Sequence, residues 1–312
     1  MLIIRKFEDL EEIKSSVVTI GSYDGLHIGH LDILKKTISY SKKLKYPSIL
    51  ITFEPHPKQV LDPNLNDGFL ITSFDDKMTL IKKAGIDFVF IITFNKNFSE
   101  MTAQKFLEDI IKKSFNPKAI VVGYNHHFGF NRTGNSQFLN KFCSSNDIIL
   151  DVVNPIKNKG KTVSSSYIRA LVRSGKVSSI KYFLGRFYGY NGTICKGSGR
   201  GSKLDFPTAN IVSSEKMQIM PMEGVYFVSI SIVGLELYGM CNFGTRPTFK
   251  ENDLIMEVNI FHKFSHDLYG KNIRIKFLVK IRDEVAFKSS EELKNQLIKD
   301  KNKCLSLQKE YD

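Results

Sequence analysis

Apolar positions in the first half of the chain predict strands that alternate with helices. Short apolar runs typical of buried strands occur at 17–20, 48–53, 87–94, 119–123 and 148–153. The segments between them repeat apolar residues at helical spacing, with Thr102 as a candidate N-cap and Gly175 as a candidate C-cap, at 28–44, 77–84, 102–113, 137–145 and 164–174. This alternation favours a parallel sheet whose ligands collect at the carboxyl ends of the strands.

The pattern changes near residues 183–188. Beyond this point short alternating or apolar runs are separated by Gly and Pro, at 225–233, 237–242, 255–261 and 273–279. A last helix is predicted at 289–300, with Ser289 or Ser290 as its N-cap. We therefore predict a Rossmann-like α/β domain at 1–184 and a mostly antiparallel β-barrel or sandwich at 185–312 with a terminal helix.

Composition adds an excess of positive charge to this picture. The 312 residues are 42% hydrophobic and 25% charged, which excludes a collagen-like, wholly disordered or small disulfide-rich chain. The 45 basic and 32 acidic residues leave a net charge of +13, which favours anionic partners. Of the basic residues 36 are Lys and 9 are Arg, and no run of five basic residues occurs. Lysines dispersed over solvated faces are therefore favoured over a nucleic-acid-binding surface.

Cysteine usage and hydropathy indicate a cytoplasmic protein. The four cysteines form no CxxC pair, so zinc-site spacing is lacking and reduced thiols are expected. The first residues turn charged too early for a signal peptide. The most apolar run, 88–92, is far shorter than a membrane span, and no membrane partner is expected.

The first chemical motif follows the strand at 17–20. It reads Gly-Ser-Tyr-Asp-Gly-Leu-His-Ile-Gly-His over 21–30 and opens a helix whose free N–H groups can bind phosphate. His27 and His30 lie three residues apart and can face one ligand, with Gly29 removing a side chain between them. They could steady charge on a triphosphate as a bond at the α-phosphorus breaks. A capped turn with two incidental histidines is the alternative, and the strand–turn–helix context favours the functional interpretation.

A second phosphate half-site is predicted at the helix over 164–174. It opens with three serines, Ser164 to Ser166, and Arg169 follows one turn on. Hydroxyls, a helix N-terminus and a guanidinium can share one anion, although an ordinary N-cap with a surface arginine is equally compatible.

These motifs resemble those of the adenylyl-transferring nucleotidyltransferase superfamily. More closely, residues from about 16 to 301 resemble the bacterial bifunctional riboflavin kinase/FAD synthetase family, which implies an α/β nucleotidyltransferase domain followed by a riboflavin kinase barrel. The matching segments include 21–25, 52–57 and 122–129, in the same order as in the family. The resemblance implies that the first domain joins FMN to the AMP part of ATP and releases pyrophosphate.

The resemblance also implies roles for individual residues of the first domain. His27 and His30 would contact the ATP phosphates, and Asn125 would orient ATP and the flavin phosphate. Phosphate oxygens would be held by Ser164 and Arg169. The turn around ATP would consist of Gly21, Ser22, Asp24 and Gly29.

Three histidines of the first domain leave alternatives open. His126 and His127 stand where a common family form has Phe and Arg, so a phosphate contact and loop filling are both compatible with them. His56, between two prolines, either shapes the flavin pocket or ends a strand.

The second chemical motif is glycine-rich and spans 192–210. A flexible loop with nearby cations could cradle phosphate through Gly197, Arg200 and Gly201, although it is not a P-loop. Thr208 and Asn210 lie two apart on an extended segment and offer oxygen ligands to Mg²⁺ beside a nucleotide. A plain Gly-rich hairpin is the alternative.

The resemblance to the same family implies a riboflavin kinase role for this segment. Residues 206–210 and 242–249 resemble the two riboflavin kinase signatures. Glu257 would be the general base for the riboflavin 5′-hydroxyl, and Arg282 and Phe287 would contact the flavin. Asp205 departs from the family, because Gly is usual before the Phe.

Three functions remain open at this point. The first is a two-site enzyme that makes FMN from riboflavin and ATP, and FAD from FMN and a second ATP, with Mg²⁺. The second is a single-activity adenylyltransferase with an impaired kinase, motivated by Asp205 and His127. The third is a basic nucleic-acid-binding protein, motivated only by the charge.

Overall fold

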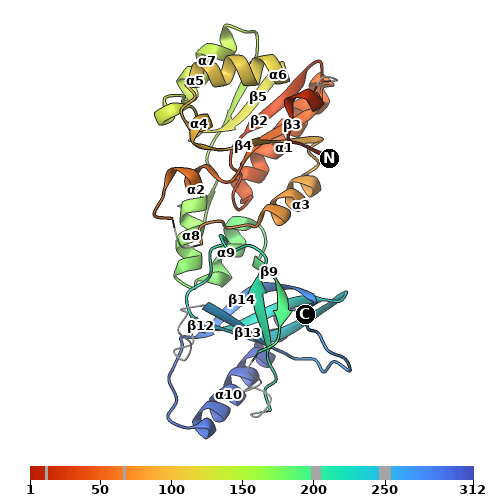
Figure 1. Cartoon of the computed structure of the whole chain (residues 1–312), viewed down its shortest axis with the longest axis vertical. Coiled ribbons are helices and arrows are strands. Elements are labelled where there is room, and N and C mark those ends of the chain that lie inside the picture. The colour runs from red at the N-terminus through yellow and green to blue at the C-terminus, as the bar shows by residue number, and fades with distance from the viewer. Residues whose placement is uncertain (11–12, 66–67, 198–204, 246–253) are drawn as a thin grey trace. The chain divides into compact units, whose positions relative to one another are not determined.

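The computed structural model describes residues 1–10, 13–65, 68–197, 205–245 and 254–312 (Figure 1). The chain forms two compact units, Met1–Ser165 and Ser166–Asp312. Among the described residues no helix is both long and apolar enough to cross a membrane.

The first unit is built on a six-stranded sheet in which every neighbouring pair is parallel. The strands are β1 (Leu2–Ile4), β2 (Ser16–Ile20), β3 (Ser48–Glu54), β4 (Phe88–Thr93), β5 (Pro117–Gly123) and β6 (Ile149–Val153). Their order is β1-β4-β3-β2-β5-β6. From β2 the chain moves to β3 and β4 on one side, then returns to β5 on the other. The direction therefore reverses between β2 and β5, and this switch point is where open α/β sheets bind ligands.

Helices cover both faces of this sheet because its strands are apolar on both faces. On one face Leu50, Val89 and Val121 pack against α1 and α3 through Leu34 and Ile81. On the other face the alternate strand residues pack against residues 103–115 and α7. The helical segments are η1 (Phe7–Leu10), α1 (Ile28–Leu44), α2 (Pro57–Leu61), α3 (Phe74–Ala84), α4 (Lys96–Ser99), α5 (Ala103–Lys105), η2 (Phe106–Lys112), α6 (Lys113–Phe115), η3 (Phe130–Arg132) and α7 (Ser136–Ser144). A small hairpin, β7 (Lys157–Asn158) and β8 (Lys161–Thr162), follows β6.

The helix predicted at 102–113 is present, but it is not a regular α-helix throughout. Thr102 caps it as predicted, accepting a hydrogen bond from the Lys105 N–H at 3.3 Å. A π-helical segment over 106–112 lies between α5 and α6. Apolar spacing alone does not distinguish these two helical geometries.

The second unit contains a closed antiparallel barrel, as the sequence predicted. Its strands are β9 (Tyr188–Cys195), β10 (Ala209–Ser213), β11 (Gly224–Ile232), β12 (Leu235–Thr245), β13 (Leu254–Ile260) and β14 (Asn272–Arg282). They close in the order β10-β13-β12-β11-β14-β9. Two helices precede the barrel, α8 (Ser165–Arg173) and α9 (Val177–Leu184), and α9 packs against β9 and β14.

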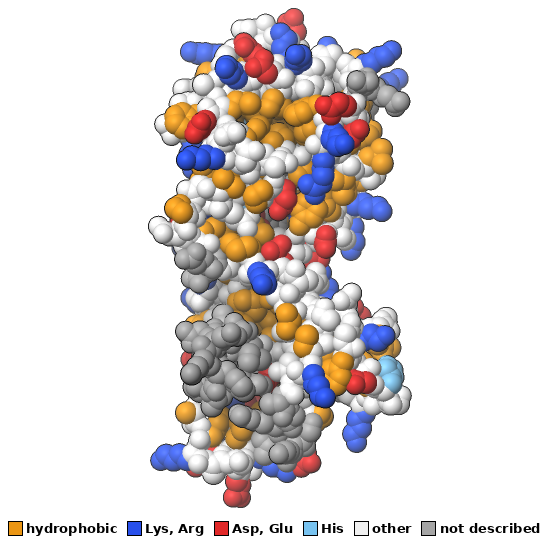
Figure 2. All heavy atoms as spheres, viewed as in Figure 1, with side chains coloured by type: hydrophobic (Ala, Val, Ile, Leu, Met, Phe, Trp, Pro, Cys, Tyr) orange, Lys and Arg blue, Asp and Glu red, His pale blue; other side chains and the backbone are white. Residues whose placement is uncertain are grey.

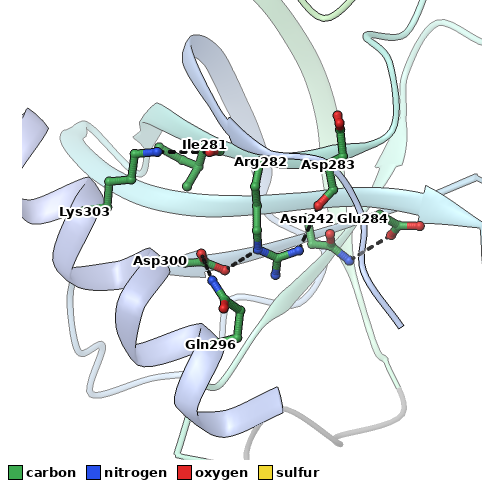
Figure 3. Close-up of polar contacts among 8 residues, drawn as sticks. All are labelled: Asn242, Ile281, Arg282, Asp283, Glu284, Gln296, Asp300 and Lys303. Atoms are coloured by element: carbon green, nitrogen blue, oxygen red, sulfur yellow. Dashed lines mark hydrogen bonds and ion pairs between the residues drawn. The ribbon is translucent and has the colours of Figure 1, made fainter. Parts of the chain in front are cut away.

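The terminal helix α10 (Ser290–Gln308) packs on the barrel wall. Ser289 is its N-cap and accepts from the Glu292 N–H at 3.1 Å. The buried Cys304 joins the apolar cluster of Phe206 and Phe227. Lys303 donates to the carbonyl of Ile281 on β14 at 3.1 Å (Figure 3). The helix is longer than the 289–300 that the sequence predicted.

The domain boundary stays a prediction at residue 184. The two compact units divide between Ser165 and Ser166, so α8 and α9 are counted with the barrel by compactness. The boundary predicted at 184 rests instead on the change of hydrophobic period and on where the motifs of each domain lie.

Candidate functional sites

The histidines predicted to act together lie together at the start of α1. Their rings stack with centroids 3.7 Å apart and planes inclined by 13°. His27 is buried and caps α1, because its Nδ1 accepts the His30 backbone N–H at 3.1 Å. A nitrogen that accepts a hydrogen bond carries no proton, so His27 is a neutral imidazole with its proton on Nε2. Gly29 fits this arrangement, since a Cβ there would lie 3.2 Å from the His27 Nδ1.

Tyr23 supports the histidine pair, a role that residue spacing did not indicate. The residue is buried in a left-handed conformation with φ of 51°. Its ring contacts His30 edge-on at 5.1 Å, and its hydroxyl bonds the Thr19 hydroxyl within β2. Burial raises the pKa of Tyr23, so the phenol stays protonated. Tyr23 also lies 3.1 Å from where a Cβ at Gly21 would stand, which accounts for that glycine.

Asp24 anchors the turn to the segment before α3. Its buried carboxylate accepts the Ile71 N–H at 2.9 Å and 3.1 Å and the Thr72 N–H at 3.3 Å. The Asp24 carbonyl accepts the Ser165 hydroxyl at 2.9 Å. Ser165 therefore lies against the turn after β2. Ser164 directly precedes this contact, and Arg169 lies one helical turn further along α8.

Asn125 follows β5, on the other side of the switch point. His126, next to it, stacks on Phe128 with ring centroids 5.4 Å apart. Burial, with a smaller contribution from His127, lowers the pKa of His126 to about 4. His126 is therefore uncharged near neutral pH, which removes it from the candidates for phosphate binding by charge.

Arg132 was not predicted from the sequence, and it brings a permanent charge next to His127. The His127 Nδ1 is 2.9 Å from the Asn125 carbonyl and 3.4 Å from the Arg132 Nη2. A carbonyl only accepts, so Nδ1 donates to Asn125 and the guanidinium lies beside a protonated nitrogen. Left-handed backbone at Asn131 and Arg132 folds this loop back. Residue spacing does not show such a fold, so the sequence did not indicate that Arg132 lies beside His127.

His56 has the structural role that the sequence analysis held open. Its Nδ1 accepts the Lys58 N–H at 3.1 Å, and its own backbone N–H donates to the Gln59 side chain at 2.9 Å. The two bonds form a capping box at the N-terminus of α2. The ring also packs edge-on against Phe69 at 5.1 Å. A flavin contact at His56 stays a prediction.

Strand register places Glu257 between two asparagines of the barrel wall. Asn210 on β10 and Asn242 on β12 are its direct partners on the two neighbouring strands. Directly opposite residues point to the same side of a sheet. This side is opposite to that of the buried Met256 and Val258. An acid between two amides is a group that can accept a proton while both amides bind oxygen atoms of a ligand. Thr208 lies two residues before Asn210.

Arg282 is held by helix α10 (Figure 3). Its Nε donates to the Asp300 carboxylate at 2.9 Å, and its Nη1 donates to the Asp283 carbonyl at 2.9 Å. Gln296 binds the other oxygen of the same carboxylate at 2.8 Å. The Phe287 ring centroid lies 5.7 Å from the guanidinium carbon. Arg282 and Phe287, the two residues predicted to contact the flavin, are therefore neighbours. The buried carboxylate of Asp300 holds the Arg282 guanidinium in place.

Glu284, two residues after Arg282, contacts Asn242 on β12. Its carboxylate accepts from the Asn242 amide at 3.5 Å (Figure 3). Gly244 lies so close to Glu284 that a Cβ there would overlap the carboxylate. Burial and the nearby Glu223 raise the pKa of Glu284. No separate role was predicted for Glu284 from the sequence, because residue spacing does not show its contact with Asn242.

The end of the glycine-rich segment shows why glycine is usual at position 205. Asp205 has φ of 64°, the left-handed conformation that glycine adopts without strain. Its exposed carboxylate pairs with Lys294 of α10 at 2.7 Å, which lowers the pKa of Asp205. Gly197 packs against Asn210, with no room for a Cβ. Arg200 and Gly201, predicted to bind ATP, lie outside the described residues.

Basic side chains are spread over the surface in both units. Figure 2 shows Lys and Arg singly or in small groups on the face in view. Among the described residues no cluster of three or more His, Cys, Asp or Glu could hold a metal ion. A magnesium ion would instead depend on Thr208, Asn210 and the nucleotide itself, a neutral oxygen set that suits Mg²⁺ beside phosphate.

Two family models match the chain in succession. The FAD synthetase family matches residues 9–167, and the riboflavin kinase family matches residues 184–307. Together they cover both the histidine turn and the barrel with its terminal helix.

Relatives match over nearly the whole chain. Proteins named bifunctional riboflavin kinase/FMN adenylyltransferase are 34% identical in Buchnera aphidicola from Acyrthosiphon pisum, covering 96% of each chain, and 30% identical in Escherichia coli K12, again covering 96% of each. The Bacillus subtilis protein of the same name is 30% identical over 95% of this chain and 93% of its own. A solved structure described as a macrolide-efflux protein from Streptococcus pneumoniae has a TM-score of 0.86 and 29% identity, over 96% of this chain and 97% of that one.

Proposed function

The chain belongs to the bifunctional riboflavin kinase/FMN adenylyltransferase family, and we propose how its own residues divide the two reactions. One reaction phosphorylates riboflavin to FMN with ATP. The other transfers the adenylyl group of a second ATP to FMN and gives FAD. The parallel-sheet unit matches the FAD synthetase family, and the barrel matches the riboflavin kinase family.

The stacked histidines support adenylyl transfer at the switch point of the parallel sheet. A phosphate oxygen of FMN attacks the α-phosphorus of ATP, and the bond from that phosphorus to the pyrophosphate oxygen breaks. Negative charge then grows on the leaving pyrophosphate. His27 donates through Nε2 and His30 lies against it, so both can stabilise this charge, together with the N-terminus of α1.

Other residues of this site bind and orient rather than take up charge. Asn125, at the end of β5, orients ATP and the flavin phosphate, and Ser164 and Arg169 hold phosphate oxygens. The contact between Ser165 and Asp24 supports the role of Ser164, because it places the neighbouring serine against the turn after β2. Asp24 shapes the turn through backbone hydrogen bonds, so its effect on ATP is indirect.

The row of Asn210, Glu257 and Asn242 supports phosphoryl transfer in the barrel unit. Glu257 takes the proton of the riboflavin 5′-hydroxyl as that oxygen attacks the γ-phosphorus, and ADP leaves. Mg²⁺, held by Thr208 and Asn210, would neutralise phosphate charge. Gly197, Arg200 and Gly201 would surround the phosphates, and Arg282 with Phe287 would contact the flavin.

The ion pair of Asp205 with Lys294 argues against an impaired kinase. Repulsion of ATP by Asp205 was the reason to consider one, and the pair offsets that charge. Riboflavin, FMN and ATP are the expected ligands, in a cytoplasmic setting and without nucleic acid.

Product analysis tests the whole proposal. The full chain is incubated with riboflavin, ATP and Mg²⁺, and FMN, FAD, ADP and pyrophosphate are separated. His30→Ala should stop FAD formation and leave FMN formation, and Glu257→Gln should stop FMN formation and leave FAD formation from added FMN. Loss of both activities in either variant would contradict two separate sites.

A further inference from the structure

Lys77 is a buried lysine that the two reactions, as described above, do not use. It lies on α3, and only 7% of its surface is exposed. An ammonium group is costly to bury, so a lysine in this position needs compensating partners. Burial lowers the pKa of Lys77, whereas the negative charges of Glu54 and Asp24 raise it.

The partners of Lys77 form a chain of hydrogen bonds that ends at the phosphate turn. The Lys77 Nζ is 3.5 Å from the hydroxyl oxygen of Thr52 on β3, and that oxygen is 3.3 Å from the carbonyl of Ser22. The donor and the acceptor of each of these hydrogen bonds follow from the groups involved. An ammonium only donates and a carbonyl only accepts, so Thr52 accepts from Lys77 and donates to Ser22. Thr52 is fully buried, so water does not compete for its hydroxyl.

We propose that Lys77 is a positioning residue for adenylyl transfer, which holds the turn at Gly21 and Ser22 through Thr52 and offsets the negative charges of Asp24 and Glu54. This inference rests on the proposed function, because it takes the turn after β2 as the binding site of the ATP phosphates. Without Lys77 the turn loses a polar anchor, and Asp24 and Glu54 lose one nearby positive charge. Both effects weaken ATP binding more than they slow the bond-breaking step.

Two substitutions in the full chain separate the relay from general packing. Lys77→Met removes the charge and keeps the length, and Thr52→Val removes the hydroxyl and keeps the shape. FAD formation from FMN is measured against ATP concentration, and riboflavin phosphorylation by the same sample reports on the integrity of the protein. The matched control is Lys83→Met, which removes an exposed lysine from the last turn of the same helix.

The proposal predicts a change in KM for ATP. Lys77→Met should raise it about tenfold and Thr52→Val about threefold, with kcat within about twofold, consistent with loss of one charged hydrogen bond. The double variant should be no worse than Lys77→Met alone, because both act through one relay. Lys83→Met and the kinase activity should be unchanged.

Three outcomes would overturn the relay. One is an unchanged KM for ATP in Thr52→Val, which decides the matter even if Lys77→Met does not fold. The others are effects that multiply in the double variant, and a loss of kcat with KM for ATP unchanged. Failure of the proposed function is distinguishable, because the unaltered protein would then form no FAD at all.

Discussion

His27 has two separate tasks at the start of α1. Its Nδ1 caps the helix, and its Nε2–H is the donor proposed to face the ATP phosphates. Asparagine is among the best N-cap residues, but it cannot reproduce the stacked imidazole. His27→Asn should therefore keep thermal stability close to that of the unaltered protein and slow FAD formation about 100-fold, the usual cost of one donor to a developing charge. His27→Ala should lose the cap as well, so comparison of the two melting temperatures isolates the capping contribution. FAD formation by His27→Asn at the normal rate would contradict the proposed role.

The buried imidazole of His126 makes stability depend on pH. Its pKa falls from 6.5 to about 4 in the folded chain because of burial. Between these pH values the unfolded chain binds more protons than the folded chain, so stability falls as the pH decreases through this interval. The loss at pH 5, relative to pH 8, is about 2 kcal/mol from this group.

His126→Phe should remove this part of the pH dependence. Phenylalanine does not titrate and can keep the stack on Phe128. Melting temperatures of the variant and the unaltered protein, measured at pH 8 and pH 5, should diverge in favour of the variant at pH 5. Parallel behaviour at both pH values would show that His126 is not protonated on unfolding.

Residue roles could be predicted where they depend on spacing along one element. His27 and His30 lie three apart at a helix start, and the structure stacks them as that spacing implies. Tyr23, Arg132 and Lys77 could not be found in this way. The first two owe their places to left-handed backbone, and the third owes its role to burial by strands distant in sequence.

At the scale of elements, register decides which residues of the barrel meet. Asn210 and Asn242 flank Glu257 although they are distant in sequence. A shift of one residue would turn Glu257 to the opposite face, and apolar alternation fixes the face but not the partners. Motif resemblance could point to each of the three residues. Only the structure shows that they lie side by side on three neighbouring strands.

Helix α10 holds Arg282 through one buried acid. Asp300 is 3% exposed and holds Arg282, which is proposed to contact the flavin. Asp300→Asn should destabilise the barrel by about 3 kcal/mol, because it leaves a partly buried guanidinium without its counter-charge. It should also raise the KM for riboflavin and leave FAD formation from added FMN unchanged. The matched control is Lys299→Met, an exposed neighbour on the same helix, and equal effects of both substitutions would exclude a specific role of Asp300.

At the scale of the whole molecule, both fold classes could be predicted from the change of hydrophobic period. The parallel sheet and the closed barrel are confirmed. The apolar pattern did not predict β1, β9 or β10. The first is a three-residue edge strand that is mostly exposed, and the last follows the glycine-rich segment, where apolar alternation is too short to register. Which strands are neighbours depends on long-range pairing, and the switch point between β2 and β5 became visible only with the sheet order.

The two reactions are proposed at separate sites, so FMN made in one molecule should serve another. This can be tested with a mixture of His30→Ala, which keeps the kinase, and Glu257→Gln, which keeps adenylyl transfer. Neither variant alone should form FAD from riboflavin. An equal mixture should form it after a lag, because FMN must accumulate in solution before the second site binds it. The lag should shorten as total protein increases and vanish when FMN is added. If the mixture formed no FAD while both variants kept their single activities, FMN would have to pass between sites within one molecule.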